Sequence, residues 1–240
     1  MYRILAQHKD FMVINKGPGL GMHDETDEAG LLHPGLVSRV KADTGLLLYP
    51  VHRLDKMTSG LVLLARTTEA NRALSMAFAA REVSKQYLAL SDRKPKKKQG
   101  WVKGDMQKGR GGSWMLARSQ DNPAISWFDS VSVREGLRLY RIKPQTGKTH
   151  QIRVALKSVG APILGDERYG GTAADRGYLH AWRLAFTLAG KRSTSSVRLM
   201  KARCLCCPSC TPPSRGWPNE GGDSARSTGS ARQRLDPGGF

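Results

Sequence analysis

Cysteine is absent from the first 203 residues of this 240-residue chain, and its four cysteines lie close together near the C-terminus. The main part of the chain therefore has no disulfide framework, which favours a reducing compartment. The cysteines follow the spacing C-x-C-C-x-x-C, which suits zinc, but no second ligand pair follows and no histidine lies beyond His180. We therefore expect no metal site. The four residues are Cys204, Cys206, Cys207 and Cys210.

A membrane-spanning stretch and a signal peptide are also lacking. The longest apolar run, near Leu61, is far shorter than the roughly 18 residues that are needed to cross a bilayer. Polar residues from Gln7 to Asp10 interrupt the apolar stretch near the N-terminus, which excludes the form of a signal peptide. We expect a cytoplasmic protein that does not contact a membrane.

Acidic residues are scarce, because 20 Asp and Glu stand against 39 Lys and Arg and give a formal charge of +19. Such an excess favours polyanionic partners, chiefly nucleic acid, with binding that depends on salt. The cations are densest between Ser91 and Arg118, where Trp101 and Trp114 lie among them, a pattern that suits RNA phosphates and exposed bases. The alternative is a solvated loop whose charge serves solubility. The nine basic residues of this basic segment are Arg93, Lys94, Lys96, Lys97, Lys98, Lys103, Lys108, Arg110 and Arg118.

One acidic residue, Asp55, lies in a short basic turn just before an apolar run at residues 61–65. His52, Arg53 and Lys56 surround it in the sequence. A nearby opposite charge favours the ionised form of a carboxylate even where it is partly buried. Asp55 is therefore a candidate nucleophile or base, and a surface salt bridge before a core strand is the alternative.

Hydrophobic periodicity predicts an α+β fold with a mixed, largely antiparallel sheet and flanking helices. Alternation of apolar and polar residues predicts strands, and apolar residues at helical spacing predict helices. No repeated strand–helix–strand period is present. The expected strands are residues 3–6, 11–15, 59–66, 83–90, 124–134, 137–143 and 179–188, and the expected helices are residues 68–81, capped by Thr68, and 149–158.

The composition changes abruptly near residue 192. Residues 193–240 contain Ser, Arg, Gly and Pro in bulk and no sustained periodicity. Such a segment cannot bury enough apolar surface to offset the cost of ordering it. We expect one folded domain over residues 1–192, followed by a disordered tail or by the product of an altered reading frame.

Several polar side chains are expected to project together. Lys85 and Tyr87 are two residues apart in a predicted strand and so share a face. His150, Arg153 and Lys157 are three to four residues apart in a predicted helix, whose N-terminus suits anions. A salt-bridge set on the helix surface is the alternative. The loop at residues 16–23 has a weak G-x-G-x-G pattern, and the acidic loop that follows it is expected to be solvated.

Ordered motifs along the chain resemble those of the RluA family of RNA pseudouridine synthases. His52-Arg53-Leu54-Asp55, followed by Thr58-Ser59-Gly60-Leu61, is similar to the family signature, and Lys85-x-Tyr87 is similar to its Lys-x-Tyr strand. Residues 147–154 are similar to the family's Gly-Arg-Thr-His-Gln-Ile-Arg-Val segment, with Lys148 in place of arginine. The resemblance covers about residues 1–192 and includes Lys16-Gly17-Pro18-Gly19 with His23, Gly165-Asp166-x-x-Tyr169-Gly170 and Leu179-His180-Ala181.

The resemblance implies the pseudouridine synthase catalytic fold and the isomerisation of specific uridines in RNA, without cofactor or metal. It implies that Asp55 is catalytic, that Arg153 pairs with it, and that Tyr87 stacks on the target base. Arg53 is implied to flip the uridine and take its place in the RNA. Flipping costs a few kcal/mol for a paired base and less in a loop, so stem-loops of rRNA or tRNA are the expected substrates.

The resemblance also implies a set of substrate-binding residues. Lys85, His150 and the basic segment are expected to hold phosphates. Lys148 keeps the charge of the family's arginine but loses its two-pronged hydrogen bonding. We expect a monomer. The substrate-binding set is His52, Arg53, Leu54, Lys85, Lys148, His150, Gln151 and Ile152.

Two other functions are alternatives to RNA pseudouridine synthase activity. A non-catalytic RNA-binding protein accounts for the charge and the aromatic residues, but gives no reason for the Arg-Leu-Asp turn. A metal-dependent nuclease would use Asp24, Asp27 and Glu28 as ligands and would require magnesium. The RNA pseudouridine synthase is the function that the sequence favours.

Overall fold

A mixed sheet of ten strands runs through the part of the chain that this computed structural model describes, residues 1–188 and 190–196. Its strands are β1 (Tyr2–Gln7), β2 (Phe11–Lys16), β5 (Tyr49–Pro50), β6 (Ser59–Ala65), β7 (Ser84–Ser91), β8 (Gln99–Gly104), β11 (Ala124–Arg134), β12 (Leu137–Pro144), β13 (Leu179–Leu188) and β14 (Lys191–Ser196). Two small hairpins lie outside it, β3 (Glu25–Thr26) with β4 (Leu32–His33), and β9 (Met106–Lys108) with β10 (Trp114–Leu116). The helices are α1 (Leu36–Thr44), α2 (Thr68–Ala79) and α3 (Gln151–Ser158), with 3-10 turns at Arg110–Gly112 and Glu167–Tyr169.

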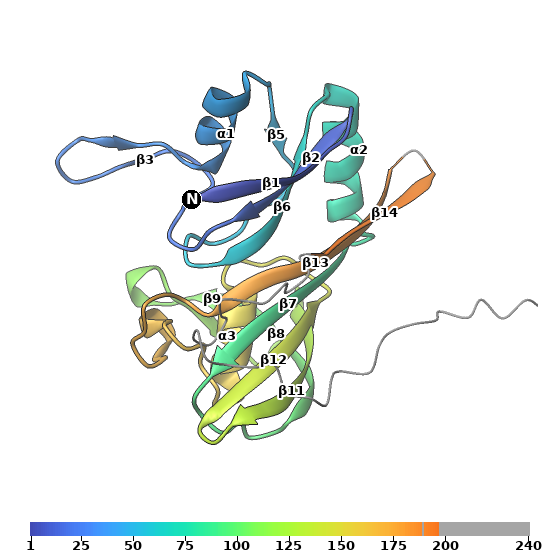
Figure 1. The fold of residues 1–240 in the computed structure, drawn as a ribbon. Helices are drawn as coiled ribbons and strands as arrows, with labels where there is room; N and C mark the ends of the chain where they lie inside the picture. Colours follow the sequence, from blue (N-terminus) through green and yellow to red (C-terminus); the bar gives the residue numbers. More distant parts are fainter. Residues whose placement is uncertain (189, 197–240) are drawn as a thin grey trace, which may run out of the picture. The chain divides into compact units, whose positions relative to one another are not determined.

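Strand β13 joins two groups of strands. The sheet order β1-β2-β6-β13-β7-β12-β11-β8 places it between β6 and β7 (Figure 1). It runs parallel to β6 at only two residue pairs, His180 with Ser59 and Ala181 with Gly60. From Arg183 onward β13 pairs with β14 on that side instead. The sheet therefore splits beside β13, and a cavity opens next to the split.

The strand after Asp55 is buried on both of its faces, which explains its unbroken apolar sequence. Leu61 and Leu63 of β6 belong to a core with Leu74 of α2. Val62 and Leu64 point the other way and belong to a core with residues of α1. A strand covered by helices on both faces is a rigid support for the turn that precedes it.

The second group of strands has one large core, into which α3 packs. Ile152 and Leu156 of α3 belong to a cluster with Phe128 of β11 and Ile142 of β12. In β11 and β12 the residues between these core positions point to the opposite face of the sheet, and most of them are polar or aromatic. Helix α3 is thereby fixed against the sheet with its N-terminus beside the cavity.

The predicted fold class is confirmed, and two helix starts differ from the prediction. Helix α2 is capped by Thr67 and not by Thr68, because the Thr67 hydroxyl accepts a hydrogen bond from the Ala70 N–H at 3.1 Å. Helix α3 begins at Gln151, two residues later than predicted. His150 adopts a left-handed conformation with φ of 56°, which is incompatible with a helical turn.

The basic segment was predicted to be a loop, but parts of it form strands β8, β9 and β10. In β8 exposed Trp101 and Lys103 flank buried Val102, a period of two that the density of lysines concealed. The short helix α1 was also not predicted. Strand β14 continues past the predicted domain end at residue 192, and the tail from residue 197 lies outside the described residues. Within the described ranges no helix has the length and apolar character to cross a membrane.

Gly60 makes the close contact between β6 and β13 possible. Its φ is +112°, and a Cβ atom there would lie 2.2 Å from the Ala181 carbonyl oxygen. We expect Gly60→Ala to lower the free energy of unfolding by about 3 kcal/mol, because it adds both backbone strain and a steric clash. The urea midpoint measures this change.

A matched control is Gly136→Ala in the hairpin turn between β11 and β12. Gly136 also has a positive φ, +66°, but a Cβ atom there meets nothing within 4 Å. Only the backbone term remains, so we expect a loss of about 1 kcal/mol. Equal losses at the two positions would show that the contact with Ala181 adds nothing.

Candidate active site

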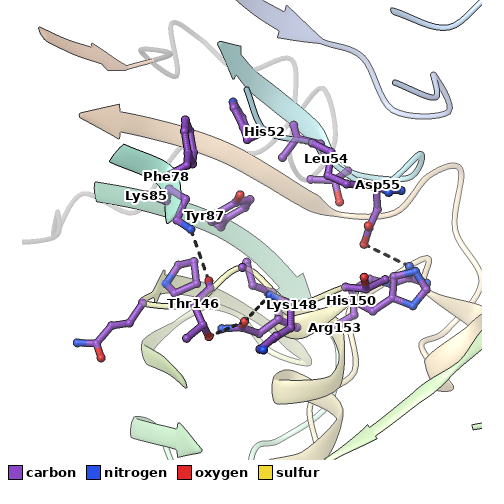
Figure 2. Close-up of a pocket in the computed structure, with 18 of the residues that line it drawn as sticks. His52, Leu54, Asp55, Phe78, Lys85, Tyr87, Thr146, Lys148, His150 and Arg153 are labelled. Atoms are coloured by element: carbon purple, nitrogen blue, oxygen red, sulfur yellow. Dashed lines mark hydrogen bonds and ion pairs between the residues drawn. The ribbon is translucent and has the colours of Figure 1, made fainter. Parts of the chain in front are cut away.

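A cavity of about 470 Å³, with cationic, polar and apolar side chains in its lining, lies beside the split in the sheet. Its walls are the turn before β6, the first residues of β7, the end of α2, and the segment from Pro144 to Arg153. Figure 2 shows side chains from these separate segments pointing toward one space. The cations of the basic segment do not line this cavity, whereas the predicted catalytic and substrate-binding residues do: His52, Arg53, Leu54, Asp55, Lys85, Tyr87, Lys148, His150, Gln151, Ile152 and Arg153.

Asp55 and Arg153 meet across the cavity, as the resemblance implied. The Arg153 Nη1 lies 3.5 Å from the Asp55 Oδ2. The rest of the guanidinium is held by Asp166, which accepts hydrogen bonds from Nε and Nη2, each at 2.8 Å. Asp166 is buried to 2% exposure. The fork fixes the direction in which Arg153 points and leaves one N–H side for Asp55.

The charge of Arg153 is secured by the same contacts. Burial disfavours a charged guanidinium, yet the hydrogen bonds and charge of Asp166 outweigh this and raise the pKa of Arg153. Asp55 itself is about one-fifth exposed. An Asp held beside a fixed cation and open to the cavity is a group that can react with a bound substrate.

Tyr169 is the point on which three side chains of the α3 region converge. His150 Nδ1 lies 2.7 Å from the Tyr169 hydroxyl, which also accepts a hydrogen bond from the Trp114 N–H. Arg153 and Lys157 lie over the Tyr169 ring at 4.8 and 5.6 Å. The side chains of His150, Arg153 and Lys157 therefore do project together, onto a buried ring. Burial and the charge of Arg153 lower the pKa of His150.

Lys85 and Tyr87 point into the cavity from one face of β7, as their spacing predicted. Lys85 Nζ lies 3.5 Å from the Thr146 carbonyl oxygen, and burial lowers its pKa. Burial and the negative charge of Asp55 raise the pKa of Tyr87, which keeps its phenol protonated. In Figure 2 Tyr87 lies between Lys85 and Asp55. The cavity thus has a lysine and a tyrosine from β7 and a carboxylate from the turn before β6.

Lys16 contacts the turn that carries Asp55, although the sequence indicated it only as part of a motif. Its side chain is fully buried, and Nζ donates hydrogen bonds to the carbonyls of Gly17, Leu20 and Lys56. Burial lowers its pKa to about 8, and the charge of Asp55 acts in the opposite direction. Because the Lys56 carbonyl follows Asp55 directly, Lys16 ties the N-terminal loop to the Asp55 turn.

His52 closes the edge that the split leaves open in β6. Its Nε2 accepts a hydrogen bond from the Leu63 N–H at 2.9 Å. Its ring stacks on Phe78 of α2, with centroids 4.7 Å apart. Burial and the charge of Lys85 lower the pKa of His52 to about 4, so the ring is neutral. His52 thus supports the cavity wall as well as lining it.

This arrangement makes stability depend on pH. The pKa of His52 is about 4 in the folded chain against an ordinary value of 6.5. Between these values the unfolded chain binds more protons, so the free energy of unfolding falls as the pH drops from 6.5 to 4. His180, whose pKa burial also lowers to about 4, contributes in the same direction.

We expect His52→Gln, which keeps an acceptor for the Leu63 N–H, to reduce this pH dependence. The measurement is the urea midpoint at several pH values between 4 and 7. A slope equal to that of the unsubstituted chain would refute the neutral, buried state of His52.

Gln151 and Ile152 were proposed to bind substrate, and the structure gives them further contacts. Gln151 Oε1 accepts from the Thr146 hydroxyl and the Lys148 N–H, while Nε2 donates to the Ile125 carbonyl and Ser126 hydroxyl. Ile152 belongs to the core beneath α3. Both are buried, so they shape the cavity floor. The Lys148 ammonium is exposed and donates to Asn122.

A second hollow of about 500 Å³ lies on the other side of Asp55. Arg53, Asp55, His150 and Arg153 line both spaces. Lys56 was expected beside Asp55, but its Nζ pairs with Glu25 at 2.5 Å. Arg153 and not Lys56 is therefore the cation that contacts the carboxylate.

The acidic residues of the predicted nuclease site do not converge. Asp27 accepts hydrogen bonds from Ala29 and Leu31 and pairs with His33 within the β3–β4 hairpin. Asp24 accepts from the Gly35 N–H. Among the described residues no group of three or more His, Cys, Asp or Glu side chains lies close enough together to hold a metal ion. The cysteine cluster lies outside the described residues.

A mixed sheet, a cavity with a single carboxylate among cations, and a charge of +19 suit an enzyme that works on a polyanion. Residues 10–158 match the family of RNA pseudouridylate synthases. The chain belongs to this family, and its activity is the isomerisation of uridine to pseudouridine in RNA.

Relatives and solved structures agree with the family. An uncharacterized RNA pseudouridine synthase of Haemophilus influenzae is 50% identical over 185 residues, which cover 76% of this chain and 81% of the relative. The ribosomal large subunit pseudouridine synthase C of Rickettsia bellii is 40% identical over half of this chain and 41% of its own length. The structure of human RNA pseudouridylate synthase domain containing 1 superposes with a TM-score of 0.68, at 22% identity over 82% and 83% of the two chains, which supports the fold.

Proposed function

We propose that Asp55 is the catalytic residue of this pseudouridine synthase. The observation that carries the proposal is the contact of its Oδ2 with Arg153, itself fixed by buried Asp166, at the wall of the cavity. In the reaction the N1–C1′ bond breaks, the base turns, and a C5–C1′ bond forms, while the C5 proton leaves to solvent and N1 takes up a proton. An ionised carboxylate suits either attack on C1′ or removal of a proton from the sugar.

The surrounding residues are proposed to hold the nucleotide. Tyr87 supplies a protonated ring on which the uracil stacks, and Lys85 and His150 lie where phosphates would approach. Arg53 is exposed at the junction of the two hollows, where it can replace the flipped base in the RNA. Lys148 contributes a point charge at the rim.

Ribosomal RNA is the substrate that we propose, in a stem-loop where flipping is inexpensive. The Rickettsia relative is named as a ribosomal large subunit enzyme, and the strong positive charge suits a large folded RNA. We propose further that the enzyme acts in the cytoplasm as a monomer, away from membranes, and without a cofactor.

Release of tritium from C5-labelled uridine tests this function. The purified chain is incubated with rRNA and tRNA transcripts in the presence of a chelator, and tritium in the solvent is counted. We expect release from rRNA, and mapping of the pseudouridine then identifies the position. The absence of release from every transcript would refute the proposal.

A further inference from the structure

Two tryptophans form a pair on the sheet face that lies opposite α3. Trp101 of β8 and Trp127 of β11 are directly opposite each other in the antiparallel register. Their neighbours Val102 and Phe128 point into the core beneath α3, so the two indoles share the other face. Trp101 is 45% exposed. We call this pair the tryptophan platform.

Cations surround the tryptophan platform. Lys103 Nζ lies 5.5 Å from the Trp101 ring centroid, and Lys143 Nζ lies 5.5 Å from that of Trp127. Arg141, which pairs with Asp129, lies 5.9 Å from the Trp127 ring. Aromatic faces beside basic side chains are the arrangement that binds unpaired nucleotides, because bases stack on the rings and phosphates pair with the cations.

The tryptophan platform lines a hollow of about 600 Å³ that adjoins the catalytic cavity. Arg81, Lys85, Pro144 and Gln145 line both spaces. No acidic residue lines the hollow among the described residues. A polyanionic strand can therefore run from the cavity to the platform without meeting a carboxylate on the way.

We propose that the tryptophan platform binds an unpaired nucleotide that flanks the isomerised uridine in the RNA. Stacking of a base on an indole is stronger than an exposed cation–π contact, so a base displaces the lysine from the ring face. The displaced lysine is then available for the adjacent phosphate. The site accepts any base, since stacking does not read hydrogen-bonding edges. The proposal rests on the proposed function for the position of the uridine.

The test measures binding of a fluorescein-labelled dodecauridylate by anisotropy. We expect Trp101→Leu to weaken binding about tenfold, which is within the range for loss of one stacked base. Trp101→Phe keeps a ring at the same position and should retain most of the affinity. Binding of a blunt RNA duplex should change little in both variants, because its bases are not available to stack.

A second variant tests the cations without disturbing the core. Lys103 is exposed, and Lys103→Gln should reduce the slope of log affinity against log salt for dodecauridylate by about one. Lys41→Gln, at an exposed position in the last turn of α1, removes an equal charge elsewhere and should leave the slope unchanged.

Three results would overturn the proposal. The first is equal affinity of Trp101→Leu and the unsubstituted chain for dodecauridylate. The second is a decrease in the slope of log affinity against log salt that is as large for Lys41→Gln as for Lys103→Gln, which would show that only the net charge of the chain matters. The third is a dimer in sedimentation that Trp101→Leu dissociates, which would assign the platform to a second copy. Because binding is measured without turnover, failure of the platform is distinguishable from failure of the proposed catalytic residue.

Discussion

Asp55→Asn is expected to reduce tritium release to below about one ten-thousandth of the unsubstituted rate. The amide keeps the shape of the side chain but is neutral, so it offers neither a nucleophile nor a base. The affinity for RNA should not fall, because the loss of a negative charge removes a repulsion from the phosphates. Arg153 keeps its fork with Asp166, and the fold should be preserved.

Single-turnover tritium release and anisotropy separate these two effects. Glu135→Gln is the control, since Glu135 is an exposed acid in the turn between β11 and β12 and lies outside both hollows. It removes the same charge and should leave the rate unchanged. Measurable turnover by Asp55→Asn within tenfold of the unsubstituted chain would assign catalysis to another group.

Asp166→Asn is expected to affect stability and turnover together. Asp166 neutralises a guanidinium whose side chain is 8% exposed, and removing one partner of a buried ion pair costs about 3–5 kcal/mol. The loss leaves Arg153 without the fork that aims it at Asp55. We expect the free energy of unfolding to fall by about 3 kcal/mol and kcat to fall far more than KM rises.

Because a merely weakened fold would lower the apparent kcat without changing KM or the pH profile, the rate is expressed per folded enzyme, with the folded fraction measured by circular dichroism at the assay temperature. A loss of kcat that persists per folded enzyme, with a changed pH profile, identifies Asp166 as a positioning residue. Glu25→Gln is the control, because it breaks an exposed ion pair that contributes little to the free energy of unfolding. Glu25 and Lys56 are both about half exposed, and such pairs contribute under about 1 kcal/mol. An equal loss of stability in Glu25→Gln and Asp166→Asn would contradict a large contribution from the buried ion pair of Asp166 with Arg153.

The sequence predicted those parts of the site that depend on local patterns. A period of two placed Lys85 and Tyr87 on one face of a strand, and the structure has them side by side in the cavity wall. The spacing of His150, Arg153 and Lys157 predicted a shared direction, which the ring of Tyr169 confirms. Asp55 and Arg153 are 98 positions apart in the sequence. Their contact was predicted from the resemblance to a known family, because no local pattern relates residues so far apart.

Other parts depended on tertiary contacts that a single sequence does not reveal. Asp166 follows a glycine in a loop, and only the fold shows that its carboxylate is buried against Arg153. The role of His52 arises because β13 leaves the edge of β6 open near Leu63. Helix α3 starts later than predicted because His150 is left-handed, and the contact of its ring with the Tyr169 hydroxyl is a tertiary one that helix propensity does not predict.

The meeting of β6 and β13 at only two residue pairs has a mechanical consequence. Asp55 is carried by the strand group on one side of this narrow seam, and Arg153 by the group on the other. The seam is the least stiff line through the sheet, because few hydrogen bonds cross it. A twist of β13 relative to β6 would thus change the separation of the Asp55 carboxylate and the Arg153 guanidinium, so the stiffness of the sheet at this seam governs the length of their contact.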